Sequence, residues 1–444
     1  MSAPTRVARS RTWFPLTQLS ACLLLGVGLL VAGALLGRAD LAALGVAPLV
    51  TAAWAWTRHP HAPVAVELHA PTAIATDRGL AAPARLLAPG GARAARLRAS
   101  SPGTTADEAV VRLVPGMPRS LTLHTTNART GPNQLFRLDV VGLGAGAAVA
   151  TDVVTVGPVG VLVLPGRQPL GHLPLPPRLH GMVGPHSSRR MGDSTELHDI
   201  APFRPGDRLR RIDWRASARR GMQGGRLHEL YVRRTQAPAE ATVMLVIDSR
   251  DEVGPDVTTW AGARPIVRSD VTSLDIAREA AASVARAYLA AGDRVGLEDL
   301  GRRQRPVPPA GGRRHAERIV RRLALASPES FVHGRVRPPV LPSGALVVLL
   351  STFLDDEAMS LALTWRHTGH RVVAVDVLPP VRGAQLTARQ LMAYRMVQIQ
   401  RADRLTVMRR GGVEVVRWPA DGPPPAGGPA RLAALARGRH GGPR

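Results

Sequence analysis

The sequence predicts a multidomain chain: an N-terminal transmembrane helical hairpin, a β-sandwich-like domain, and a doubly wound α/β domain. Three observations support this prediction. Two uncharged apolar runs lie near the N-terminus, short apolar runs separated by Gly and Pro follow, and from residue 241 fully apolar runs alternate with amphipathic ones. A length of 444 residues also exceeds that of one ordinary domain. The predicted parts are a basic N-terminus (1–15), two transmembrane helices (16–57), the sandwich-like domain (62–165), a linker arm (166–240), the α/β domain (241–380), a C-terminal helix with strands (381–420) and a disordered tail (421–444).

The first apolar run, Leu16–Gly37, is 22 residues long and uncharged, enough for a helix to span a hydrocarbon core of roughly 30 Å. The second, Leu41–Thr57, has 17 uncharged residues. A signal peptide is the competing interpretation of the first run, but the run is longer than a signal core and a second follows at once. Arginines precede the first span and Arg58 follows the second, so the positive-inside rule predicts a multi-pass plasma-membrane protein with cytoplasmic soluble domains.

Residues 62–165 contain short apolar runs with period-two alternation, as in Ser120–His124 and Leu135–Val141, separated by turn residues. This pattern is typical of a small antiparallel sandwich. Residues 166–190 are rich in Pro, Gly, His and Arg, which predicts a linker or an extended arm.

The α/β domain is predicted because continuous apolar segments, typical of buried strands, alternate with segments in which apolar residues recur at helical spacing. Ala241–Ile247, Ala345–Leu350 and Arg371–Leu378 are apolar on both faces, as buried parallel strands are. The sequence between them predicts a strand at Val295–Leu300 and helices at Thr272–Ala291, His315–Ala326 and Glu357–Thr368, the first with a capping box. Beyond residue 380 we expect a helix from Leu386 to about Arg401 and strands at Arg404–Met408 and Val413–Trp418.

Carboxylates and hydroxyls follow two of the predicted strands. Asp248, Ser249 and Asp251 follow the first strand, and Thr352 and Asp355 follow a later one. Ligands of open parallel sheets bind outside the carboxyl ends of the strands, and Mg²⁺ prefers oxygen ligands from several loops. These five residues are therefore the candidate metal ligands, with Mg²⁺ as the candidate cofactor.

A second motif lies just before the α/β domain and combines an aromatic residue, Pro-Gly-Asp and Ile-Asp-Trp-Arg-Ala-Ser-Ala-Arg. It resembles the signature of the domain-of-unknown-function family number 58. The resemblance implies a membrane-anchored protein with a domain similar to von Willebrand factor A, no enzymatic activity, and a MoxR-type AAA+ ATPase as partner. The residues that match the signature are Phe203, Pro205, Gly206, Asp207, Arg211, Asp213, Trp214, Arg215, Ser217 and Arg219.

The resemblance also implies a metal motif, Asp-x-Ser-x-Ser, after the first strand. Here Asp248 is present, but Arg250 and Glu252 stand at the two Ser positions. A guanidinium beside Asp248 would replace the cation with an internal ion pair.

Two roles are open for the signature. Its Arg and Asp residues are expected either to form a buried ion-pair network that joins the arm to the sheet domain, with Trp214 as a packing anchor, or to form a docking surface. Arg and Trp dominate the energetics of protein interfaces.

The composition restricts the remaining functions. The formal net charge is +25, but the basic residues are all Arg, spread along the chain, and aromatic residues make up only 3%. This disfavours nucleic acid as the partner, while membrane lipid remains one. The single cysteine, Cys22, excludes an internal disulfide. We therefore expect a non-enzymatic membrane adaptor in cell-envelope assembly or remodelling; the alternatives are a metal-dependent hydrolase and a charge-driven nucleic-acid binder.

Overall fold

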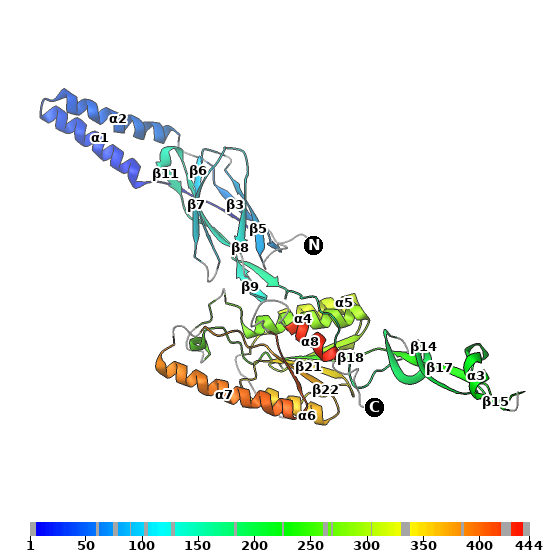
Figure 1. Cartoon of the computed structure of the whole chain (residues 1–444). Coiled ribbons are helices and arrows are strands. Elements are labelled where there is room, and N and C mark those ends of the chain that lie inside the picture. Colours follow the sequence, from blue (N-terminus) through cyan, green and yellow to red (C-terminus); the bar gives the residue numbers. More distant parts are fainter. Residues whose placement is uncertain are drawn as a thin grey trace. The chain divides into compact units, whose positions relative to one another are not determined.

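A computed structural model describes residues 6–58, 62–73, 79–88, 90–101, 105–125, 129–181, 184–223, 226–260, 265–267, 270–302, 304–329, 338–382, 386–418 and 428–437. The chain divides into two compact units (Figure 1). The first comprises the chain up to Val163 together with the short segment Val267–Ser269, and the second comprises the rest of the chain from Leu164.

The two N-terminal helices, α1 (Thr17–Leu35) and α2 (Ala39–Thr57), are long and apolar enough to cross a membrane. They pack closely because glycines face the neighbouring helix. A Cβ added to Gly33 would lie 2.5 Å from the Ala42 nitrogen, and one added to Gly45 would lie 2.7 Å from the Gly26 oxygen. Small residues at such a crossing let the two backbones approach, as they do in membrane helix pairs.

The rest of the first unit consists of antiparallel sheets that share one hydrophobic core. Val66, Leu86 and Leu138 are fully buried in this core, and the first two lie on a different sheet from the third. The arrangement is that of a sandwich, as the alternating sequence predicts. One sheet contains β1 (Arg6–Arg9), β3 (Ala65–Leu68), β4 (Thr72–Ala73), β5 (Leu80–Leu87) and β8 (Arg119–Thr125). The other contains β2 (Trp13–Pro15), β6 (Ala94–Ser100), β7 (Asp107–Arg112), β10 (Arg137–Leu143), β11 (Val149–Thr151) and β12 (Val154–Val156), while β9 (Gly131–Leu135) pairs with β13 (Val159–Val163).

The segment before α1 was expected to be a separate basic N-terminus. Its described part instead supplies a strand to each sheet: β1 pairs with β3 and β2 pairs with β11, both antiparallel. The Ser10 hydroxyl also accepts a hydrogen bond from the Val64 N–H at 2.9 Å. The segments that flank the helical hairpin thus meet in one sheet, which the local sequence did not predict because β1 and β2 are short and their partners are distant.

The second unit is built on a six-stranded sheet with helices on both faces (Figure 1). The strand order is β20 (Val307–Ala310), β19 (Arg294–Asp299), β18 (Thr242–Ile247), β21 (Leu346–Ser351), β22 (Arg371–Asp376) and β23 (Glu414–Arg417). All neighbours are parallel except β20, which is antiparallel to β19. The expected doubly wound layout of the strands and helices is therefore present.

Residues along each central strand alternate between two cores, as the period of a strand requires. Leu245 of β18 faces α4 (Ser273–Ala291), α5 (Arg313–Ala324) and α8 (Gly428–Arg437), whereas Val246 faces α6 (Asp356–His367) and α7 (Ala388–Arg410). The predicted capping box of α4 is confirmed, with Thr272 and Asp275 bonded reciprocally, and Gly292 ends the helix in the left-handed conformation at φ 93°.

Two expectations for the C-terminal part were wrong. Arg404–Met408, expected as a strand, is the last part of α7, because Arg401, Leu405 and Met408 recur at helical spacing and are buried. The tail, expected to be disordered, contains α8 where it is described, and Leu432 packs into the core there. The other residues after 418 lie outside the described ranges.

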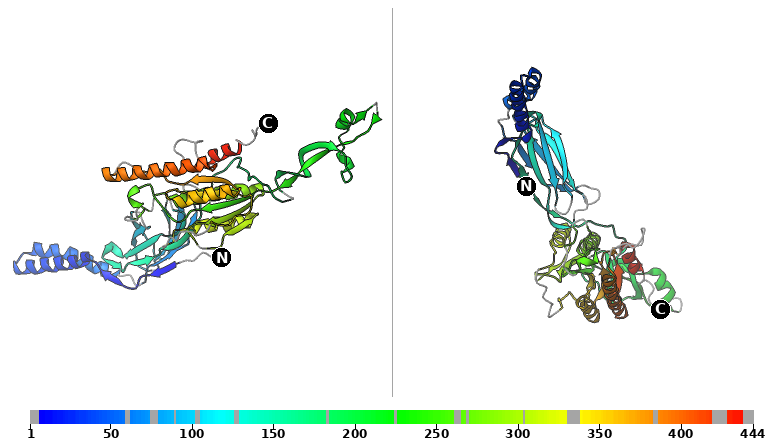
Figure 2. Two further views of the ribbon diagram at one scale, coloured as in Figure 1. Left: turned by 90° about the horizontal axis from the view of Figure 1, so that it is seen from below. Right: turned by 90° about the vertical axis from the view of Figure 1, so that its left-hand side faces the viewer.

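The described residues of the predicted linker arm form defined structure. Its first part packs on the α/β domain, where Tyr288 donates a hydrogen bond to the Pro174 carbonyl at 2.5 Å and Arg371 donates one to the Leu175 carbonyl at 2.9 Å. Its second part is a two-stranded antiparallel ribbon of β14 (His186–Pro202) and β17 (Tyr231–Ala239), shown in Figures 1 and 2. Between these strands lie η2 (Leu209–Arg211), α3 (Trp214–Arg220), β15 (Met222–Gln223) and β16 (Arg226–Leu227); the remaining short elements are η1 (Ala145–Ala147) and η3 (Val257–Thr259).

Candidate functional site

The carboxyl edge of the central sheet brings the predicted polar residues together. Asp248 follows β18 directly, and Thr352 and Asp355 follow β21, its parallel neighbour. Ser351, the last residue of β21, donates a hydrogen bond to Asp248 at 2.7 Å. Asp355 caps α6 by accepting from the backbone N–H groups of Glu357 and Ala358 at 3.1 and 3.4 Å. Two loops and one helix N-terminus therefore meet at this edge, as the strand order predicts.

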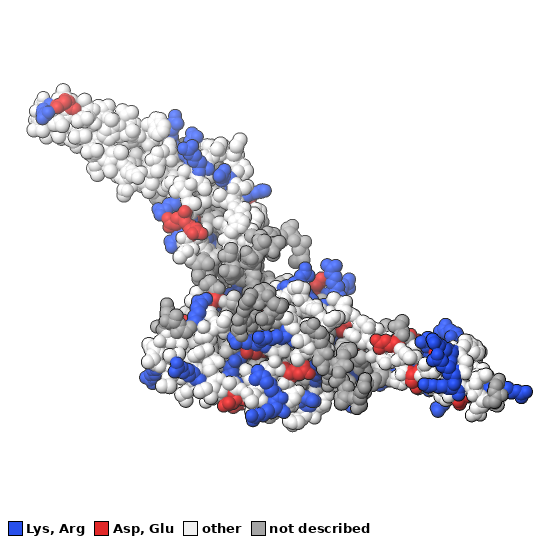
Figure 3. Space-filling view, viewed as in Figure 1, with Lys and Arg blue, Asp and Glu red and all other residues white. Residues whose placement is uncertain are grey.

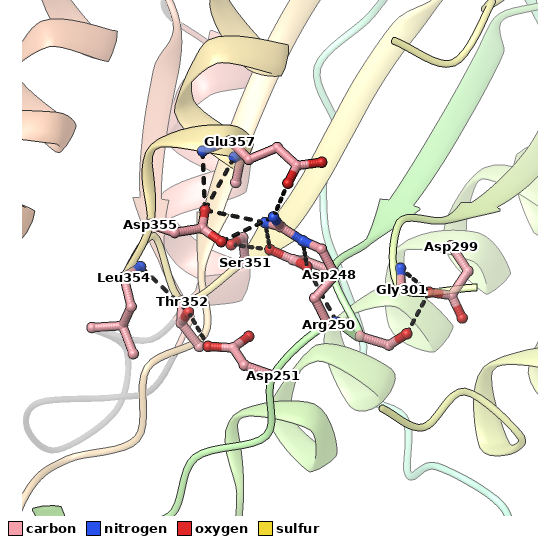
Figure 4. A network of polar contacts seen from close by, with 12 residues as sticks. Asp248, Arg250, Asp251, Asp299, Gly301, Ser351, Thr352, Leu354, Asp355 and Glu357 are labelled. Carbon is pink, nitrogen blue, oxygen red and sulfur yellow. Dashed lines mark hydrogen bonds and ion pairs between the residues drawn. The ribbon is translucent and has the colours of Figure 1, made fainter. Parts of the chain in front are cut away.

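The centre of this edge holds the guanidinium of Arg250 (Figure 4). It makes a bidentate pair with Asp248, at 2.8 Å from Nε and 2.9 Å from Nη2. It also contacts Asp355 at 2.9 and 3.1 Å and the Glu357 carboxylate at 2.6 Å. Three carboxylates, one directly after β18 and two at the start of α6, thus surround one guanidinium, and the internal ion pair inferred from the sequence is present. Sequence reasoning missed Glu357, whose position two residues after Asp355 in the first turn of a predicted helix was the available signal.

The electrostatics of Arg250 follow from this environment. Burial by itself would lower its pKa, but the hydrogen bonds and charge of Asp248, with the charges of Asp355 and Glu357, outweigh it and raise the pKa above the usual value. Arg250 is therefore a permanent cation at any physiological pH.

The other three candidate ligands, Ser249, Asp251 and Thr352, bond elsewhere than to this guanidinium. Ser249 donates to Asp299 at 2.5 Å, and Thr352 donates to Asp251 at 3.1 Å. Burial, followed by the charge of Asp248, raises the pKa of Asp251 to about 7, and burial also raises the pKa of Asp299. The five predicted ligands thus lie at one edge but in three separate sets of contacts: Asp248 and Asp355 with Arg250, Ser249 with Asp299, and Asp251 with Thr352.

These residues do not fit Mg²⁺. A divalent ion needs several oxygen ligands directed at one point. The oxygens of Asp248 and Asp355 are directed at Arg250 instead, and within the described residues no group of three or more His, Cys, Asp or Glu is placed to hold a metal.

The signature residues lie in the segment that connects the two strands of the ribbon. Phe203, Pro205 and Gly206 form the turn after β14, where Gly206 has φ 102°. Asp207 accepts the Arg204 N–H at 2.9 Å and pairs with Arg234 of β17 at 3.3 Å. The Arg204 N–H, together with Arg234, keeps the pKa of the Asp207 carboxyl below its usual range.

The second half of the signature forms a short helix with a defined start. Asp213 is its N-cap and accepts the Ala216 N–H at 2.9 Å. Ser217 is buried and its hydroxyl accepts the Tyr231 N–H at 2.8 Å, which attaches α3 to β17. Arg211 pairs with Asp193 of β14 at 2.5 Å. Arg215 and Arg219 are exposed, and Trp214 is 66% exposed.

The structure contradicts the first of the two roles expected for the signature. A buried network joining the arm to the sheet domain is wrong, because the ion pairs of Asp193, Asp207 and Asp213 that the structure describes connect parts of the ribbon to each other and are partly exposed. A packing role for Trp214 is also wrong, because most of its side chain is in solvent.

Comparison with known families adds one match. Residues 199–388 match the model of the family described as protein of unknown function DUF58. This DUF58 region begins within β14, contains the whole signature and the Arg250 network, and ends at the start of α7. No curated protein and no solved structure matches the chain.

Proposed function

We propose that this protein is a non-enzymatic, membrane-anchored adaptor that uses the ribbon of its DUF58 region to bind a protein partner in cell-envelope assembly or remodelling. The observation that carries the proposal is the exposed Trp214. An indole held in solvent on an ordered, capped helix contributes little to folding, whereas Trp is the residue type most enriched in interface hot spots.

The surroundings of Trp214 support a recognition surface with a defined chemistry. Leu209 is 70% exposed, and Met222 and Leu227 are also exposed. Residues 186–239 contain twelve Arg against six Asp or Glu, a formal net charge of +6. Figure 3 shows basic side chains gathered on this ribbon. Such a surface suits a partner that combines an acidic rim with an apolar pocket.

The resemblance to the family suggests the partner, a MoxR-type AAA+ ATPase. The parallel order β19–β18–β21–β22, with Asp248 at the end of β18, supports a von Willebrand A-like fold for the domain that carries the ribbon. The carboxylates of Asp248, Asp355 and Glu357 at the edge of that sheet are already paired with Arg250. This favours recognition over metal-dependent hydrolysis, because activation of water would need a metal or a free base.

The membrane part of the proposal places α1 and α2 across the plasma membrane with the rest of the chain in the cytoplasm. The pairing of β1 with β3 supports a hairpin, since strands in one sheet must lie on the same side of the bilayer. The arginines Arg6, Arg9 and Arg11 before α1 and Arg58 after α2 support the cytoplasmic side.

The orientation is tested by labelling with a membrane-impermeant maleimide in a Cys22→Ser background. Met117 of the first unit is 66% exposed, so Met117→Cys provides an accessible thiol. We expect labelling only after the cells are permeabilised; labelling of intact cells would place this unit outside and refute the orientation.

The partner is tested by affinity capture of the detergent-extracted full chain, with retained proteins identified by mass spectrometry. We expect an AAA+ ATPase with the native chain and its loss with Trp214→Ala. Met392→Ala is the matched control, because Met392 is equally apolar and 64% exposed but lies on α7. Retention of nucleic acid in place of the ATPase, with a steep salt dependence, would favour the charge-driven alternative.

A further inference from the structure

The carboxyl edge of the sheet is where the sequence predicts a divalent cation, yet a side chain of the protein already fills that position. Asp248, Asp355 and Glu357 converge from the ends of two strands and the first turn of α6 (Figure 4). Carboxylates brought this close repel one another unless a positive charge lies between them. In this chain the positive charge is the guanidinium of Arg250, whose side chain is 6% exposed.

The guanidinium has no hydrogen-bond donor left for a further ligand. Nε bonds Asp248 at 2.8 Å, and Nη2 bonds Asp248 at 2.9 Å and Asp355 at 3.1 Å. Nη1 contacts Asp355 at 2.9 Å and Glu357 at 2.6 Å. A guanidinium has five N–H groups, and these contacts account for all of them.

We propose that Arg250 is a built-in substitute for the metal: it holds the edge together as a bound cation would, and it prevents a divalent ion from binding there. Both kinds of cation neutralise converging carboxylates. They differ in that the guanidinium is covalently attached, remains charged at all physiological pH values and cannot dissociate.

The edge is therefore permanently assembled and independent of divalent cations. A change in Mg²⁺ concentration has no effect on the loops that follow β18 and β21. A partner that meets this surface finds no open coordination position, so any binding there proceeds equally in the presence of a chelator. This inference concerns the edge alone and holds whether or not the ribbon binds an ATPase.

The test is a titration of the detergent-extracted full chain with Mn²⁺, a paramagnetic substitute for Mg²⁺, followed by electron paramagnetic resonance after metal removal. We expect the native chain to bind no Mn²⁺ at this edge and Arg250→Ser, which removes the guanidinium and adds a hydroxyl, to bind about one equivalent. The added ion raises the thermal midpoint of that variant by roughly 5–10 °C at about a hundred times its Kd and leaves that of the native chain unchanged.

Arg404→Ser is the matched control. Arg404 pairs with the neighbouring Asp356 but contacts none of the three converging carboxylates in the described contacts, so its removal creates no Mn²⁺ site. Two results would overturn the proposal: binding of Mn²⁺ by the native chain that Asp248→Asn abolishes, or a folded Arg250→Ser chain that takes up no Mn²⁺. The measurement on the native chain tests the proposal even if Arg250→Ser does not fold.

Discussion

The carboxyl edge of the sheet and the signature ribbon use the same two residue types in opposite ways. At the edge, the side chains of Arg250 and Asp248 are 6% and 2% exposed. On the ribbon, those of Arg208 and Asp193 are 53% and 56% exposed and still form an ion pair at 3.2 Å. Both lie in segments rich in Arg and Asp, so composition does not distinguish them. Burial distinguishes them and decides what each pair contributes.

The energetic reason is desolvation. Removing one partner of a buried ion pair leaves an uncompensated charge in a poorly solvated site, whereas an exposed pair competes with water and contributes little. The edge is thus a structural framework, whereas the ribbon leaves Trp214 and much of its charge exposed to solvent. The following predictions test this difference, from the largest expected effect to the smallest.

Arg250→Ala is expected to lower the free energy of unfolding of the α/β domain by about 3–5 kcal/mol, because three carboxylates lose their common counter-ion. Denaturant unfolding of the extracted chain measures it. The ribbon supplies the comparison: Arg215→Ala, on the exposed surface of α3, should change the same quantity by no more than about 0.5 kcal/mol. If the two substitutions lowered the free energy of unfolding equally, the proposed difference between a stabilising buried edge and an exposed ribbon would be wrong.

Asp251→Asn is expected to change how the stability of the edge depends on pH. The pKa of Asp251 is raised from an ordinary value near 4 to about 7 by burial and by Asp248, so its folded form holds a proton that the unfolded chain releases. This contribution is fully present below about pH 4 and is lost as the pH rises through 7. The native chain should lose roughly 2–4 kcal/mol across this window.

The groups that face Asp251 are Asp248, Asp355, Arg250 and the Thr352 hydroxyl. Because Asn also accepts the Thr352 hydrogen bond, Asp251→Asn should match the native stability at about pH 4 and exceed it at about pH 8. Thermal midpoints at the two pH values measure this, with the exposed Asp403→Asn as control. A variant as pH-dependent as the native chain would exclude Asp251 as the cause.

Trp214→Ala is expected to weaken binding of the proposed ATPase partner by about 2 kcal/mol, or roughly thirtyfold, while leaving the unfolding free energy within about 0.5 kcal/mol. Affinity and stability are measured on the same preparation. A large loss of stability would instead show that Trp214 packs in the fold, contrary to its exposure.

Asp213→Ala is expected to cost about 1 kcal/mol of local stability in α3, since the Ala216 N–H loses its cap. Hydrogen exchange of the first turn of α3 measures this opening. Asp213→Asn retains an acceptor at the same position and should restore most of the protection. If Asp213→Ala also weakens partner binding, the ordered helix contributes to presenting Trp214.

Much of the fold could be predicted because its patterns are local. The continuous apolar runs that became β18, β21 and β22, and the helical period of α4 with its Thr272 cap, depend on neighbours a few residues away. The strand order then places Asp248 and Asp355 at one edge. The sequence also suggested an ion pair between Arg250 and Asp248, because the two are only two residues apart.

The remaining features depend on contacts between distant residues. The pairing of β1 with β3 joins segments separated by a helical hairpin, and α8 is ordered by the core that receives Leu432. Glu357 completes the Arg250 network from a position 107 residues away.

The sequence by itself therefore determined which segments are strands and helices and which residues carry charge at their ends, since period and composition are properties of neighbouring residues. Only the tertiary structure decided that Arg250 is enclosed by carboxylates and Trp214 is left in solvent, because burial depends on how separate segments pack.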